Sequence, residues 1–158
     1  MVELLVVVMV IMVIAAIAIP SLVHARMKAN EAAAVASMRT IQSAESLYTN
    51  NYPEEGFSPS LAKLGPNGSD CENPGPNNAC IIMDESLASG MKSGYVFELL
   101  GDGKHPSGAY KLTATPESAG FSGSCGFSSS ESGEIVRVSP NGGSGGSRLA
   151  MSGGSGCE

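Results

Sequence analysis

Few residues in this chain of 158 amino acids have the type and spacing needed for chemistry. The two histidines, His24 and His105, have no serine, aspartate or cysteine partner in an arrangement typical of catalysis or zinc binding. Asp102 lies between two glycines, but no repeated acidic spacing accompanies it to complete a calcium-binding set. We therefore expect no catalytic residue, no metal and no cofactor, with His24 on a polar surface and Asp102 in a turn.

The four cysteines are the other reactive side chains, and an even number in a small domain is typical of disulfides formed in an oxidising space. Four cysteines permit three pairings. We expect Cys71–Cys80, which brackets a turn-rich loop, and Cys125–Cys157, which closes an otherwise unstructured tail. Free thiols or a metal site are the alternative, but the sequence contains no C-x-x-C motif.

The N-terminal stretch is apolar without interruption from Leu4 to Ile19, and Leu22 and Val23 extend it to about the length that crosses a bilayer as a helix. A cleaved signal peptide is the alternative, but such a peptide starts with basic residues and has a shorter apolar centre. One carboxylate, Glu3, stands at the front of this stretch. Its ionisation in hydrocarbon would cost at least a few kcal/mol unless it reached the interface or a cation.

The charges near this stretch and the cysteines predict opposite orientations. Arg26 and Lys28 follow the apolar stretch, so the positive-inside rule places the rest of the chain in the cytoplasm. The cysteines instead indicate a periplasm or a cell surface. Both indications agree if a basic leader once preceded Met1.

The composition excludes some functions and limits the size of the remaining domain. A net charge of −6 and nine scattered basic residues argue against a phosphate-binding stripe, so we expect no specific nucleic-acid partner. Beyond the apolar stretch about 130 residues remain, which is enough for one small domain.

A long helix is predicted to continue past Pro20 with a kink, because residues 21–50 contain neither glycine nor proline and many alanines. Apolar residues recur at helical spacing at Ala25, Ala29, Ala32 and Ala36, then at Val35, Met38, Ile41, Ala44 and Tyr48. Polar residues are expected on other faces: Lys28, Glu31, Arg39, Gln42, Glu45 and Ser46. A helix from Val2 to Asn50 would be about 70 Å long, more than twice the thickness of the hydrocarbon core.

The rest of the chain predicts a small antiparallel sheet with loops, and hence an α+β fold. Short helices are expected within Ser58–Leu64, with Pro59 at the first helical position, and within Ile81–Ser89. Alternating apolar residues predict strands at Tyr95–Leu100, Ala109–Thr115 and Glu134–Val138, with a further short strand beginning at Cys125. The expected regions are the transmembrane half of the helix at 1–24, its amphipathic half at 25–51, a variable loop region at 52–93, and at 94–158 the sheet with its Gly/Ser-rich tail.

Residues Val2–Pro20 resemble the mature N-terminus of type IV pilins and of the pseudopilins of type II secretion. The resemblance rests on Val2-Glu3-Leu4-Leu5, on the apolar run that ends in Ala15-Ala16-Ile17-Ala18-Ile19-Pro20, and on the spacing of seventeen between Glu3 and Pro20. It is specific over this stretch and loose thereafter, although a long helix, a variable loop, a small sheet and a disulfide-closed tail extend it to the whole architecture.

The resemblance implies a structural subunit that waits in the bacterial inner membrane and then polymerises through its N-terminal helix into a pilus on the cell surface. Its partners would be copies of itself, the prepilin peptidase and the pilus assembly machinery. In the family the carboxylate at the position of Glu3 neutralises the N-terminal amine of a neighbouring subunit. Subunit assembly is therefore assigned to Glu3, Leu4, Leu5 and Pro20.

The resemblance also bears on how the chain begins. In the family a peptidase removes a basic leader, and the new terminal residue, usually phenylalanine, is N-methylated. Alignment on Glu3 and Pro20 puts that terminus two residues before Met1, so the leader and two further residues are expected to precede this sequence.

Two alternative functions stay open. A type II secretion pseudopilin would form short periplasmic filaments and have a calcium-dependent head. A membrane-tethered periplasmic enzyme or binding protein would need a cleft with convergent polar groups, and the sequence does not show one. The sequence also leaves open whether a filament would serve adhesion, motility, DNA uptake, secretion or electron transfer.

Overall fold

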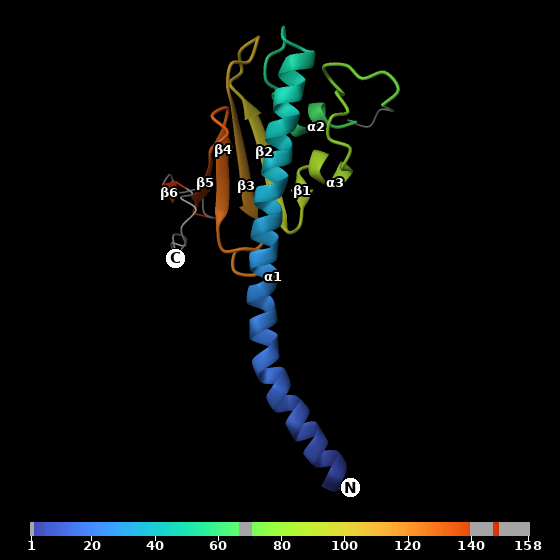
Figure 1. The fold of residues 1–158 in the computed structure, drawn as a ribbon, viewed down its shortest axis with the longest axis vertical. Coiled ribbons are helices and arrows are strands. Elements are labelled where there is room, and N and C mark those ends of the chain that lie inside the picture. Colours follow the sequence, from blue (N-terminus) through green and yellow to red (C-terminus); the bar gives the residue numbers. More distant parts are fainter. Residues whose placement is uncertain (1, 67–70, 140–146, 149–158) are drawn as a thin grey trace.

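A single long helix organises the fold. The structure, a computed structural model, describes residues 2–66, 71–139 and 147–148. Helix α1 (Val2–Asn51) has 50 residues and is therefore about 75 Å long. Its C-terminal half packs against a sheet and two short helices, which we call the head, while its N-terminal half projects beyond the head (Figure 1). This arrangement confirms the predicted long helix and the α+β class.

Pro20 lies inside α1 and does not end it. The prediction that the helix continues past this proline is confirmed. Proline removes one backbone hydrogen bond and crowds the preceding turn, so some bending is expected nearby. Figure 1 shows the N-terminal part of α1 curving gradually away from the axis of the C-terminal part.

The sheet is an antiparallel meander in which each strand pairs with its neighbour in the chain, in the order β1-β2-β3-β4-β5-β6. Every predicted strand is present within one or two residues of its predicted ends. The two-residue strands β1 and β6 were not predicted, because two residues are too few to show alternation. The strands are β1 (Met91–Lys92), β2 (Tyr95–Gly101), β3 (Tyr110–Pro116), β4 (Gly126–Ser130), β5 (Ile135–Val138) and β6 (Ser147–Arg148).

The two short helices are shorter than predicted. Helix α2 (Leu61–Leu64) has Ser60 at its N-cap, so the expectation that Pro59 occupies the first helical position is wrong. Helix α3 (Glu85–Ala88) begins only after Asp84, whose side chain accepts a hydrogen bond from the backbone N–H of Leu87. That N-cap explains why residues 81–84, which were predicted to be helical, are not.

One face of the sheet packs against α1 to form the core. The pattern along β2 alternates, with Tyr95, Phe97 and Leu99 buried and the residues between them exposed. From α1 the core receives Ala34, Met38, Ile41, Ala44 and Tyr48.

The predicted faces of α1 are wrong in two respects. The row Ala25, Ala29, Ala32 and Ala36, predicted to belong to the apolar face that the head covers, is exposed. Glu31 and Glu45, predicted on polar faces, are buried. In the first turns after the apolar stretch, the head therefore covers a different side of α1 than the alanine spacing indicated.

One disulfide joins Cys71 to Cys80, which confirms the predicted pair. It closes the loop between α2 and α3. Cys125 is buried next to the start of β4. The predicted partner of Cys125, Cys157, lies outside the described residues, as does most of the tail from residue 140 onward.

Candidate functional site on the first helix

The N-terminal half of α1 exposes large apolar side chains on all sides. The most apolar window of 18 residues in this helix has a mean hydropathy of 3.1, and none of it is buried. Its length and composition are sufficient to cross a membrane. We call residues 2–24 the apolar half; its exposed large side chains are Val2, Leu4, Leu5, Val6, Val7, Val8, Met9, Val10, Ile11, Met12, Val13, Ile14, Ile17, Ile19 and Leu22.

The four residues assigned to subunit assembly all lie in the apolar half, and all four side chains are exposed. Glu3 lies in the first turn of α1, where a carboxylate is favoured by the positive end of the helix dipole. Leu4 and Leu5 follow it, at 73% and 62% exposure. Pro20 lies about 25 Å further along the helix, at the rise of 1.5 Å per residue. The arrangement offers one charge, which can pair with a cation, and an apolar rod, which can pack against lipid or another apolar surface.

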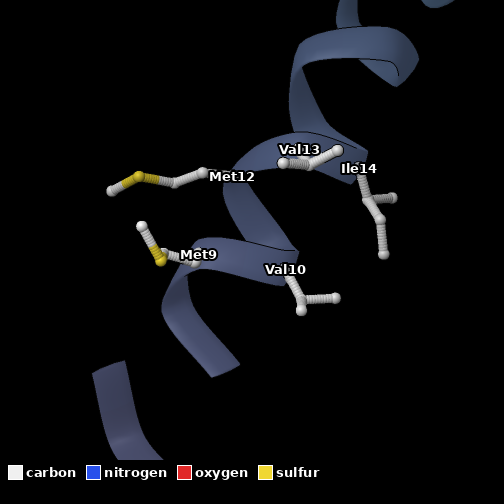
Figure 2. Close-up of a pocket in the computed structure, with 5 residues that line it drawn as sticks. All are labelled: Met9, Val10, Met12, Val13 and Ile14. Carbon is white, nitrogen blue, oxygen red and sulfur yellow. The ribbon is translucent and has the colours of Figure 1, made fainter. Parts of the chain in front are cut away.

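The apolar half also carries a shallow hollow between neighbouring turns, lined by Met9, Val10, Met12, Val13 and Ile14. Figure 2 shows the two methionine side chains on one side of the helix and Val10 and Ile14 on another, all reaching outward from one helix. Such a hollow has no opposite wall and no polar group to orient a small ligand. It is part of the apolar surface.

Glu31 fixes the head to α1 just above the apolar half. Its Oε1 accepts hydrogen bonds from the backbone N–H of Ser124 at 3.0 Å and from the Ser124 hydroxyl at 2.6 Å, and its Oε2 lies 3.3 Å from the Lys28 Nζ. Burial alone would raise the pKa of Glu31, but the hydrogen bonds from Ser124 and the nearby ammonium of Lys28 outweigh it, so the pKa is lowered. Glu31 is thus held as a carboxylate.

Glu45 lies near the upper end of the head, in an environment that disfavours its charged form. It is fully buried, and its Oε2 accepts one hydrogen bond, from the backbone N–H of Ser58 at 2.9 Å. Its Oε1 is buried without a hydrogen-bond partner. Burial raises the pKa of Glu45 to about 7, because one backbone hydrogen bond offsets only part of the lost hydration.

Sequence reasoning missed the burial of these two glutamates, although a signal was available. Glu31 precedes the fully buried Met38 by seven residues, and Glu45 follows it by seven. Residues seven apart lie on nearly the same side of a helix, so one buried position predicts the other two. Their charge favoured a solvent-exposed assignment instead.

The remaining candidates are accounted for by local structure. His24 is exposed on α1, and the Nδ1 atom of the exposed His105 lies 3.7 Å from a carboxylate oxygen of Glu55. Asp102 accepts hydrogen bonds from the backbone N–H of Lys104 and from the hydroxyl of Ser107, which confirms its predicted role in a turn. Within the described ranges no three histidine, cysteine or acidic residues come together as a metal site would require.

Comparison of the chain with protein-family models, with curated protein sequences and with solved structures finds no match. The functional interpretation therefore depends on the apolar half of α1, on Glu3 and on the way the head is attached.

Proposed function

We propose that this chain is a structural subunit, a pilin, that polymerises through its N-terminal helix into a type IV pilus filament on the bacterial surface, and that it is not an enzyme. One observation carries the proposal: α1 is a continuous helix whose apolar half is exposed on all sides, while its other half is built into the head. The subunit waits in the inner membrane after processing by a prepilin peptidase, and the pilus assembly machinery moves it into the filament.

Such a helix must present a surface that is favourable both in lipid and in a bundle of helices. In the membrane the apolar half contacts lipid, and in a filament it contacts the same half of other copies. Lipid and a helix bundle are similarly apolar, so transfer between them gains little, and packing and electrostatics must set the register of the subunits. Glu3 is the only acidic residue among residues 1–24. An attraction to a cationic group of a neighbouring copy is strong at low dielectric and is satisfied at one offset.

The test is substitution of Glu3 by alanine. We expect Glu3→Ala to give a membrane-inserted, disulfide-bonded subunit whose yield in sheared surface filaments falls by about tenfold or more, since roughly 1.4 kcal/mol corresponds to a factor of ten. Glu54→Ala, which removes an exposed head carboxylate, is the matched control and should leave the yield unchanged. A normal filament yield from the Glu3→Ala chain would contradict the assigned role of Glu3, and absence of any surface filament containing the unmodified chain would contradict the proposal itself.

A further inference from the structure

The head has one exposed aromatic side chain at the end that faces the apolar half of α1. Phe121 is 76% exposed, more than any other large apolar side chain of the described head. It belongs to the connection between β3 and β4, which lies beside α1 at the lower end of the head in Figure 1. Transfer of this side chain from water to an apolar environment would be favourable.

The turn that carries Phe121 is well ordered by hydrogen bonds. The backbone N–H groups of Phe121 and Ser122 both donate to the carbonyl of Ser118, at 3.0 and 2.9 Å, and that of Gly120 donates to the carbonyl of Gly123 at 2.9 Å. The Ser122 hydroxyl accepts a hydrogen bond from the backbone N–H of Ser118. The exposure of Phe121 therefore belongs to a defined turn.

This turn is attached to α1 at a fixed height. The side-chain amide of Asn30 donates to the carbonyl of Ser122 at 3.0 Å, and Ser124 is bound by Glu31 of the next position on the helix. Val23, the last residue of the apolar stretch, precedes Asn30 by seven residues, or about 10 Å of helix. The headgroup region on each side of the hydrocarbon core is roughly 5–7 Å thick, so its outer edge lies within about one side-chain length of the level at which this turn is attached.

The charges at the same level favour an anionic lipid surface. Arg26 and Lys28 lie on α1 between Val23 and Asn30, and both are exposed. The carboxylate of Glu31, which is the nearest acid on the helix, is buried; one of its oxygens accepts a hydrogen bond from Ser124 and the other lies 3.3 Å from Nζ of Lys28. The charge of Lys28 is therefore partly balanced, and Arg26 is the main source of positive potential at this level. Glu117, at the start of the turn, is the exposed acidic side chain of residues 117–123, so the exposed charged side chains at this level are two basic ones, Arg26 and Lys28, and one acidic one.

We propose that Phe121, together with Arg26 and Lys28, docks the base of the head onto the anionic headgroup layer of the membrane before assembly. The phenyl ring enters the interface and the two basic side chains contact lipid phosphates, which orients the head relative to the bilayer. The inference rests on the membrane-spanning part of the proposed function and does not depend on filament formation.

The absence of tryptophan from the sequence gives a direct test. Phe121→Trp introduces a single indole into the full chain, which is then reconstituted into vesicles of phosphatidylcholine and phosphatidylglycerol with and without brominated acyl chains. We expect quenching by the brominated lipid and protection from iodide in solution. Leu100→Trp, at an exposed position near the far end of β2, is the matched control and should show the reverse.

The electrostatic part is tested in the same Phe121→Trp chain. Replacing Arg26 by glutamine should lower the ratio of docked to undocked heads by about fivefold, since a basic residue near an anionic surface contributes about 1 kcal/mol. Lys28→Gln should have a smaller effect, because Lys28 is also paired with Glu31. Vesicles of phosphatidylcholine alone should give a loss similar to that of Arg26→Gln.

Three outcomes would overturn the inference. If the Phe121→Trp chain sediments with vesicles but its indole stays open to iodide, docking is wrong while membrane insertion stands. If protection appears only at a high ratio of protein to lipid, a second copy covers Phe121 instead of lipid. If the chain does not sediment with vesicles at all, the docking inference and the membrane-spanning part of the proposed function fail together. A filament defect alone would bear only on the filament-forming part of the proposed function.

Discussion

Glu45 makes the stability of the head depend on pH near neutrality. Its pKa is raised from 4.5 to about 7 by burial, so the folded protein holds a proton there that the unfolded chain releases above pH 4.5. The stabilisation from this group is therefore complete below pH 4.5 and is lost as the pH rises to 7. The loss amounts to roughly 3 kcal/mol at 1.36 kcal/mol per pKa unit.

We predict that Glu45→Gln removes this loss. The amide is similar in shape and can still accept the hydrogen bond from Ser58, but it does not ionise. Urea unfolding of both chains in the same detergent, from pH 4 to 9, should give a difference in the free energy of unfolding that grows between pH 4.5 and 7 in favour of the variant and then stays constant. Curves that run parallel throughout this range would show that Glu45 does not ionise on unfolding as we expect.

The contribution of Glu31 to stability should depend on pH in the opposite direction. Its pKa is lowered in the folded protein, so its contribution is present above pH 4.5 and is lost as the solution becomes more acidic. Glu31→Ala leaves the backbone N–H of Ser124 without its acceptor, and we predict a destabilisation of about 2–3 kcal/mol at pH 7. Glu31→Gln retains an acceptor oxygen and should lose less. The measurement is again urea unfolding, and equal losses in the two variants would argue against the hydrogen bonds as the cause.

At the level of elements, the loop between α2 and α3 is held by the Cys71–Cys80 disulfide and by the packing of Ala79 and Ile82 in the core. Few of its residues contribute to the core, whereas closing a loop with a sequence separation of 9 restricts the unfolded chain by about 2.7 kcal/mol on the loop-entropy model.

We predict that replacing both Cys71 and Cys80 by serine lowers the free energy of unfolding by up to about 2.7 kcal/mol while leaving the sheet folded, because the strands and α1 do not need this loop to pair. The unfolding midpoint in urea and the amide-exchange protection of β2 and β3 are the two measurements. Loss of protection in the strands under native conditions would mean that the disulfide is needed for the fold of the head.

The sequence predicted an element accurately where its alternation of apolar and polar residues was long. Strands β2 and β3 have seven residues each with clear alternation, and they were predicted to within one or two residues. The start of α3 was misplaced because the competing N-cap at Asp84 decides it, and a cap depends on local geometry that periodicity does not describe. The orientation of α1 could not be taken from its alanines, because alanine favours a helix without favouring burial.

On the scale of the whole molecule, the two halves of α1 have separate roles: the C-terminal half belongs to the core of the head, and the apolar half does not. Along the described chain, Met27 is the first buried residue and Ala34 is the first residue of the main core cluster. No residue from 2 to 24 is buried. The apolar half of α1 therefore adds little to the folding of the head. Under the proposed function its task is contact with lipid and with other copies.

This separation predicts the behaviour of a chain that starts at Ala25. We expect it to be a water-soluble monomer whose free energy of unfolding, measured with urea, agrees with that of the full chain in mild detergent to within about 0.5 kcal/mol, the usual range for surface changes. Retaining residues 25–51 is essential to the design, since Met38, Ile41 and Tyr48 are fully buried. A matched chain that starts at Thr40 removes Met38 together with Glu31, and it should not fold. If the chain starting at Ala25 were itself unfolded, the apolar half would have a role in the stability of the head that its exposure does not explain.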